Sequence, residues 1–227
     1  MQKLIHMDET LGKIIRKVYY FDEPGKQCTE GVIEAVKDTV KETKIDCLII
    51  ASTSGETALK FAKALKNKKI RIICVSEPPS RRVFGDKWPC INQETRKKLE
   101  KQGVIIVDRV PYKFHDSVLE MAKWYTPVPE HIVGDTFAFV GGQGLKVAVE
   151  VMFMAVQGGY VEPNREVIAV GGYGGGADTA VIVKTCFPED LFSSDIERRL
   201  EVREIIAMPR KKKYWNWDKR SCLKQNL

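Results

Sequence analysis

The sequence predicts an α/β fold with a largely parallel sheet that is covered by helices on both faces. Three observations lead to this prediction. Short apolar runs that are typical of buried strands alternate with segments of helical periodicity. The 227 residues are enough for a sizeable buried core. The strand expected at 166–171 leads directly to the strand expected at 178–184, without room for a crossover helix. These two strands must therefore form an antiparallel pair, which makes the sheet mixed.

The order of the elements follows from hydrophobic periodicity and from turn residues. We expect strands at 17–21, 46–51, 70–75, 104–107, 166–170, 179–183 and 202–207. We expect helices from Thr29, where the hydroxyl would cap the first turn, at 55–66, at 93–102 and over 133–157, the last interrupted near 141–144. The proline-rich connection 77–91 is expected to run over the surface, and 109–131 to be less regular.

Most of the net charge of +7 lies in the last 18 residues. Seven basic residues and one acidic residue occur from Arg210 onward, so this tail contributes +6 and the remaining chain only +1. A nearly neutral body argues against nucleic-acid binding by the domain. The tail itself interleaves aromatic residues with cations, which suits RNA, although a solvated terminus or docking on a neighbouring subunit is an equal alternative.

Several classes of protein are not indicated. The six cysteines are scattered without a CxxC pair, as is typical of reduced thiols in a cytoplasmic protein. No apolar run reaches the length of a membrane span, and the N-terminus lacks the apolar core of a signal peptide. The three histidines have no metal-ligand spacing, so we expect no metal site.

The strongest functional signal follows the strand at 46–51. There the chain continues as Ser52-Thr53-Ser54-Gly55-Glu56-Thr57 and enters a helical pattern. A helix N-terminus offers unpaired N–H groups and the positive end of a dipole, so it binds phosphate readily, and hydroxyl groups add further donors. The alternative is a helix cap, but one cap requires one hydroxyl and this turn has four. We therefore predict an anion site in this turn.

The second signal is the glycine cluster that joins the two strands of the antiparallel pair. Gly172, Gly174, Gly175 and Gly176 would let the backbone approach a ligand, and Asp178 and Thr179 would make directional contacts. The letters match a dinucleotide fingerprint, but a strand follows instead of a helix, so we reject that interpretation. A flexible hairpin tip is the alternative. The cluster leaves the same edge of the sheet as the 52–57 turn, which predicts one shared site.

Three weaker candidates remain open. Gly142, Gln143 and Gly144 are either a second helix N-terminus that faces the ligand or a kink between two packed helices. Glu150 lies in an apolar run and either hydrogen-bonds a ligand or a neighbouring turn, or faces water. Lys26 either reaches a phosphate or simply belongs to a turn.

A family resemblance supports this interpretation. The segment Leu48–Ala58 resembles the C-terminal α/β domain of pyruvate kinase, in which the corresponding turn holds a phosphate of a sugar bisphosphate activator. The wider pattern is similar to stand-alone archaeal and bacterial proteins of this kind. The further matching segments are 20–26, 158–159, 166–172, 176–180 and 205–210.

The resemblance implies a three-layer α/β/α fold with about five main strands and no pyruvate kinase activity, because the catalytic barrel is missing. It also implies that flavin mononucleotide (FMN) or a similar phosphorylated ligand can bind. We expect a cytoplasmic homo-oligomer with an N-terminal helical extension (1–16), one α/β domain (17–209) and a basic aromatic tail (210–227). A flavin-dependent oxidoreductase, or a regulatory module whose tail binds RNA or protein, is the alternative.

Overall fold

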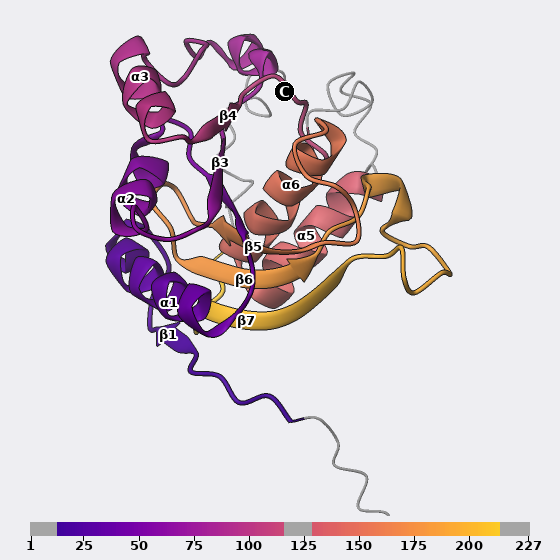
Figure 1. The fold of residues 1–227 in the computed structure, drawn as a ribbon. Helices are drawn as coiled ribbons and strands as arrows, with labels where there is room; N and C mark the ends of the chain where they lie inside the picture. The colour runs from indigo at the N-terminus through magenta and orange to yellow at the C-terminus, as the bar shows by residue number, and fades with distance from the viewer. Residues whose placement is uncertain (1–12, 116–128, 214–227) are drawn as a thin grey trace, which may run out of the picture.

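The computed structural model describes residues 13–115 and 129–213, which form one mixed sheet with helices on both sides (Figure 1). The strand order in the sheet is β1-β7-β6-β5-β2-β3-β4. The strands of this part of the chain are β1 (Tyr19–Phe21), β2 (Cys47–Ala51), β3 (Arg71–Val75), β4 (Ile105–Val107), β5 (Glu166–Gly171), β6 (Thr179–Lys184) and β7 (Glu201–Pro209).

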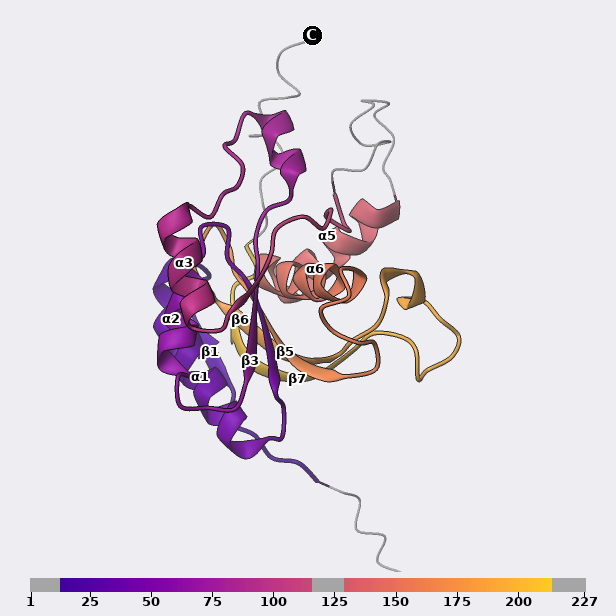
Figure 2. The same ribbon diagram turned by 45° about the horizontal axis from the view of Figure 1, so that its top comes forward.

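The helices form the two outer layers. In Figures 1 and 2, α1, α2 and α3 cover one face of the sheet, and α5 and α6 cover the other. Their bounds are α1 (Thr29–Glu42), α2 (Glu56–Ala64), α3 (Gln93–Lys101), α5 (Pro129–Gly141) and α6 (Gln143–Gln157). Short 3-10 helices occupy η1 (Lys26–Cys28), η2 (Pro79–Phe84) and η3 (Pro188–Asp190). The fold is therefore the three-layer α/β/α arrangement that the sequence predicts.

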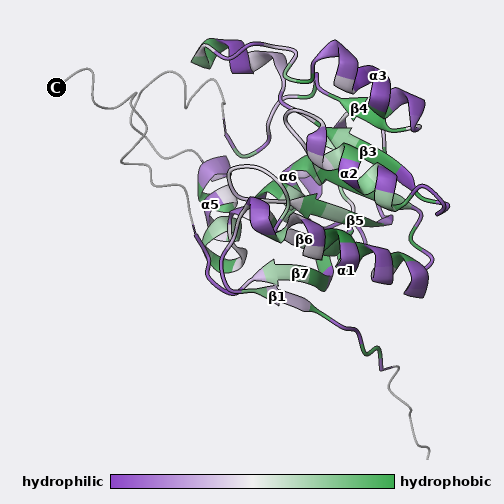
Figure 3. Cartoon of the chain, turned by 90° about the vertical axis from the view of Figure 1, so that its left-hand side faces the viewer, coloured by the Kyte–Doolittle hydropathy of each residue, from purple (hydrophilic) through white to green (hydrophobic). Residues whose placement is uncertain are grey.

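Alternation along the strands divides the interior into two cores. On β2, Leu48 and Ile50 pack with α1 and α2, whereas Cys47 and Ile49 pack with α6. Both faces of the central strands are thus apolar, which explains why these strands appear as continuous hydrophobic runs in the sequence. The helices α1, α2 and α3 turn hydrophilic positions outward, as Figure 3 shows.

The order of the strands reverses at β2, because the chain adds β3 and β4 on one side of it and β5 on the other. The strand β3 lies parallel to β2 on one side, and β5 lies parallel to β2 on the other. The loops that follow β2 and β5 therefore leave the same edge of the sheet from neighbouring strands. In open α/β sheets a ligand crevice forms at such a position. The antiparallel pair of β5 and β6 confirms the predicted hairpin.

Most predicted elements are present, with several corrections. Five strands have five or more residues, and the edge strands β1 and β4 add three residues each. Thr29 does not cap α1: it is the first helical residue, and its hydroxyl accepts a hydrogen bond from Ala177 N instead (3.0 Å). The predicted N-terminal helical extension is not helical over residues 13–16, and its remainder lies outside the described residues. The surface connection 77–91 contains η2.

Candidate functional site

The turn after β2 positions the N-terminus of α2. Gly55 is the residue that precedes the helix, and its φ of 84° lies in the left-handed region that favours glycine. A β-carbon at this position would lie 2.8 Å from Thr95 Cγ2 and 2.9 Å from Leu99 Cδ1 on α3. The glycine therefore lets the turn pack closely on α3, and it directs the first N–H groups of α2 toward the edge of the sheet.

The hydroxyl groups of this turn do not all have the same role. Ser52 is buried, and its Oγ accepts a hydrogen bond from Ala58 N (3.3 Å), so this hydroxyl supports the first turn of α2. Thr53 Oγ1 donates to Glu77 Oε1 (2.7 Å). Ser54 is exposed and Thr57 is 8 % exposed. Ser54 Oγ accepts only a long hydrogen bond from Glu56 N (3.5 Å), and Ser54 and Thr57 both line the cavity, so their hydroxyls are the ones left to meet an external acceptor.

The glycine loop lies at the carboxyl end of β5. Gly174, Gly175 and Gly176 have φ values of 66°, 122° and 68°, all in the region that favours glycine. A β-carbon on Gly176 would lie 2.8 Å from Lys26 Cα. This loop consequently packs against the turn that precedes α1, and it presents its backbone rather than side chains at the edge of the sheet.

Asp178 anchors that loop from inside the protein. Its Oδ2 accepts hydrogen bonds from Gly25 N (3.0 Å) and Tyr173 N (2.9 Å), and its Oδ1 accepts one from Thr179 Oγ1 (2.8 Å). Both Asp178 and Thr179 are 0 % exposed. Asp178 and Thr179, which the sequence predicts as ligand contacts, therefore form hydrogen bonds within the protein. Asp178 joins the loop to the turn that precedes α1.

Replacing Asp178 separates the effect of its hydrogen bonds from that of its charge. We expect Asp178→Ala to lower the free energy of unfolding by about 2–3 kcal/mol, because buried N–H groups lose their acceptor. Asp178→Asn should retain most of the stability, since its amide oxygen can accept the same two backbone bonds. Urea denaturation followed by circular dichroism measures both values, and equal losses in the two variants would contradict this role.

The charge of Asp178 also predicts a pH dependence. Burial raises the pKa of the Asp178 carboxyl above its ordinary value of 3.8, although three hydrogen bonds act in the opposite direction. A carboxyl whose pKa is raised by folding contributes stability at low pH, and that contribution is lost as the pH rises through the folded pKa. The wild type should therefore lose stability relative to Asp178→Asn as the pH is raised from below 3.8 toward neutrality. A difference in unfolding free energy that stays constant over this range would be inconsistent with the assignment.

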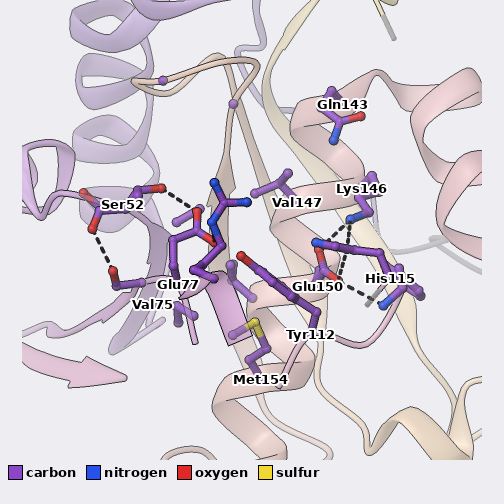
Figure 4. Close-up of a pocket in the computed structure, with 18 of the residues that line it drawn as sticks. Ser52, Val75, Glu77, Tyr112, His115, Gln143, Lys146, Val147, Glu150 and Met154 are labelled. Atoms are coloured by element: carbon purple, nitrogen blue, oxygen red, sulfur yellow. Dashed lines mark hydrogen bonds and ion pairs between the residues drawn. The ribbon is translucent and has the colours of Figure 1, made fainter. Parts of the chain in front are cut away.

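One cavity of about 1100 Å³ joins the two loops (Figure 4). The predicted residues that line it are Ser52, Thr53, Ser54, Thr57, Gly172, Gly174, Gly175, Gly176, Gln143 and Glu150. The loop after β2 and the glycine loop thus meet at the predicted edge of the sheet.

Other predicted residues lie beside the cavity rather than in its lining: Gly55, Glu56, Asp178, Thr179, Lys26, Gly142 and Gly144. Lys26 is exposed in the turn before α1. Gly142 precedes α6 with a φ of 87°, so the predicted break between two helices is present there. A β-carbon on Gly144 would lie 2.2 Å from Asp178 Oδ1, so this glycine permits close packing of α6 on β6.

The wall formed by α6 contains an ion pair that the sequence analysis did not identify. Lys146 Nζ donates to Glu150 Oε2 (2.6 Å), and it also lies 3.0 Å from His115 Nδ1. Glu150 Oε1 accepts from the backbone N–H groups of Lys113 (3.1 Å) and Phe114 (3.0 Å). Glu150 therefore hydrogen-bonds a neighbouring turn, which was one of its alternatives, and it does not face water. The i, i+4 spacing of Lys146 and Glu150 is the sequence feature from which their ion pair could have been predicted. No feature of the sequence near His115 indicates that it joins them.

Electrostatics keeps Glu150 ionised despite its burial. Burial by itself raises the pKa of a carboxyl, but the Lys146 ammonium, together with His115, holds the pKa of Glu150 below its ordinary value of 4.5. Lys146 and Glu150 are 8 % and 4 % exposed. The wall therefore has a charge-compensated pair at the cavity surface.

Aromatic and proline-rich segments complete the lining. Tyr112 and His115 stack with ring centroids 4.0 Å apart, and Phe114 packs edge-on against Phe153 (5.8 Å). From the connection 77–91, Glu77, Arg81, Val83 and Phe84 reach the cavity. The predicted surface loop therefore contributes to the site.

The part of the chain that the structure describes contains neither a metal-binding cluster nor a membrane-spanning helix. No group of three or more histidine, cysteine, aspartate or glutamate residues in these ranges is arranged to hold a metal ion. In the same part of the chain, no helix has the length and apolar character needed to cross a membrane. The part of the tail beyond Lys213, with all three of its aromatic residues, lies outside the described residues.

Fold and site together define a three-layer α/β/α domain with a cavity at the carboxyl edge of its parallel strands. Comparison with protein-family models matches residues 30–183 to the pyruvate kinase α/β domain. The match covers more than half of the chain and includes both cavity loops and α6. The chain therefore belongs to the pyruvate kinase α/β domain family, which confirms the resemblance inferred from the sequence.

Proposed function

We propose that this protein binds a phosphorylated small molecule, with FMN as the favoured ligand. The observation that carries this proposal is the meeting of the 52–57 turn and the glycine loop in one cavity. The N-terminus of α2 would attract the phosphate, and the hydroxyls of Ser54 and Thr57 would donate to its oxygens. The backbone of Gly174–Gly176 would lie against the remainder of the ligand.

The cavity is large enough for such a ligand. Its volume of about 1100 Å³ slightly exceeds the range of roughly 300–1,000 Å³ of ordinary small-molecule pockets. The aromatic rings of Tyr112 and Phe114 and the apolar side chains of Val147 and Met154 also line the cavity. A ligand that joins a phosphate to a flat ring would therefore meet both donors and apolar surface in this lining.

Comparing FMN with riboflavin tests the phosphate site, since the two molecules differ only by the phosphate group. We expect FMN to bind at least tenfold more tightly, because charge-assisted hydrogen bonds are each worth about 1.5–3 kcal/mol. The double substitution Ser54→Ala/Thr57→Ala should remove most of that preference. Quenching of flavin fluorescence during titration with the protein measures these affinities.

A control variant tests whether a loss of binding is specific to the hydroxyls of the 52–57 turn. Thr43 Oγ1 donates to Thr39 O at the end of α1, so Thr43→Ala removes a hydroxyl elsewhere in the fold. This variant should bind FMN as the wild type does. Equal binding of riboflavin and FMN by the wild type would refute the phosphate site.

A further inference from the structure

The cavity has a second polar region, on the wall that α6 provides. In Figure 4, Ser52 and Glu77 lie on one side of the cavity, and Lys146, Glu150 and His115 lie on the other. The two regions belong to different layers, because α2 packs on one face of the sheet and α6 on the opposite face. A ligand that fills the cavity from the 52–57 turn would therefore extend toward α6.

Counting donors shows what the α6 wall can offer. An ammonium group has three N–H donors, and those of Lys146 have two partners among the described residues, Glu150 Oε2 and His115 Nδ1. The third donor is available where Lys146 lines the cavity. His115 Nδ1 also lies 3.1 Å from Glu150 Oε1, so this nitrogen accepts from Lys146 when it is unprotonated and donates to the carboxylate when it is protonated. In the first arrangement, and in a doubly protonated ring, Nε2 carries a proton and is a second donor.

The charges on the α6 wall determine which kind of ligand group can accept hydrogen bonds from it. The charges of Lys146 and Glu150 offset each other, so the wall favours a neutral acceptor over a second full anion. The ring of Tyr112 stacks on His115 (4.0 Å between centroids), Lys146 Nζ lies 5.7 Å from the centroid of Phe114, and both rings line the cavity as apolar surface. Donors set in an aromatic wall suit a carbonyl oxygen on a planar ring.

We propose that Lys146 and His115 bind a ring carbonyl oxygen of the ligand, whose phosphate occupies the 52–57 turn. This inference rests on the proposed function, and it specifies the ligand as a phosphorylated compound with a carbonyl-bearing heterocycle. Isoalloxazine and oxopurine rings share this chemistry. Glu150 is a positioning residue, because it orients Lys146 from inside the protein and is itself held by the backbone of residues 113 and 114.

Two nucleotides that differ only at adjacent positions of one purine edge test the proposal together with FMN. Inosine monophosphate has a C6 carbonyl oxygen and an N1–H group where adenosine monophosphate has a C6 amino group and an unprotonated N1, and their phosphate and ribose are identical. We expect isothermal titration calorimetry to show inosine monophosphate binding about tenfold more tightly than adenosine monophosphate. Tighter binding of FMN than of both nucleotides would identify the ring as a flavin, and the opposite order would identify it as a nucleobase.

Two variants remove the donors without leaving a buried charge. His115→Phe keeps a ring next to Tyr112, and Lys146→Met/Glu150→Gln replaces the ion pair by neutral side chains of similar size. Both should weaken binding of FMN and inosine monophosphate about tenfold, and neither should change the affinity for adenosine monophosphate by more than about twofold. Lys63→Met, on the exposed side of α2, is the matched control for the loss of one positive charge.

The outcomes separate this inference from the proposed function. If both variants bind FMN and inosine monophosphate as the wild type does, the α6 wall does not recognise the carbonyl, and the inference is wrong even where riboflavin binds weakly. If riboflavin binds as well as FMN but loses affinity in both variants, the phosphate site fails and the carbonyl site stands. If neither flavin nor either nucleotide binds, the inference is overturned, and inorganic phosphate titrated in ³¹P NMR decides the phosphate site by itself.

Discussion

Lys146→Met should lower the free energy of unfolding by about 3–5 kcal/mol, the typical loss when one partner of a buried ion pair is removed. The carboxylate of Glu150 would remain 4 % exposed without its counter-charge. Its two hydrogen bonds from backbone N–H groups compensate only part of the cost of burying that charge. Urea denaturation of the wild type and the variant measures the difference.

The second substitution Glu150→Gln should recover much of this loss. A glutamine amide oxygen can accept the same backbone hydrogen bonds, and the buried charge is gone. A double-mutant cycle over the two positions should therefore give a coupling energy of about 2 kcal/mol or more. Additive effects of the two substitutions would show that the pair is not coupled and would contradict the buried ion pair.

The pKa of Glu150 sets the pH range of this measurement. Because the pKa in the folded protein lies below the ordinary value of 4.5, the stabilisation is complete above that pH and is lost as the pH falls toward the folded pKa. The cycle should be measured near neutral pH. Its coupling energy should decrease in strong acid.

Gly171→Ala should lower the free energy of unfolding by about 3 kcal/mol through steric overlap. A β-carbon on Gly171 would lie 2.2 Å from Gly144 O and 2.7 Å from Ala148 N. Both are backbone atoms of α6, so the helix would have to move away from β5. Thermal or urea unfolding reports the loss directly.

Gly174→Ala is the matched control for that substitution. Gly174 has a φ of 66°, but a β-carbon there would meet no atom within 4 Å. Its cost should be only the backbone strain of an alanine in the left-handed region, about 1 kcal/mol. If Gly174→Ala were as destabilising as Gly171→Ala, the loss at Gly171 could not be assigned to the contact of α6 with β5.

The two positions illustrate which information is local. The sequence shows a glycine cluster, and it predicts correctly that these glycines join two strands at the edge of the sheet. It does not show that Gly171 is required by a helix 27 residues earlier, at Gly144. That requirement depends on the distance between α6 and β5, which no local pattern encodes.

The same distinction applies to the polar residues of the site. Hydroxyls at the start of a helix pattern are a local signal, so Ser54 and Thr57 could be identified from the sequence. Asp178 also appeared to be a ligand contact, but its partners are the backbone N–H groups of Gly25 and Tyr173. One of these donors is 153 residues away in the chain, and only the fold brings it near.

The sequence by itself determined the order of strands and helices, the antiparallel pair, the break before α6 and the two loops at one edge of the sheet. These features follow from periodicity, turn residues and chain direction, all of which are local properties. The tertiary structure alone decided that His115 and Lys146 face those loops across one cavity, and that Asp178 is directed inward. Side chains from separate layers meet only when both layers pack on the sheet, so their contacts depend on the packed fold rather than on neighbouring residues.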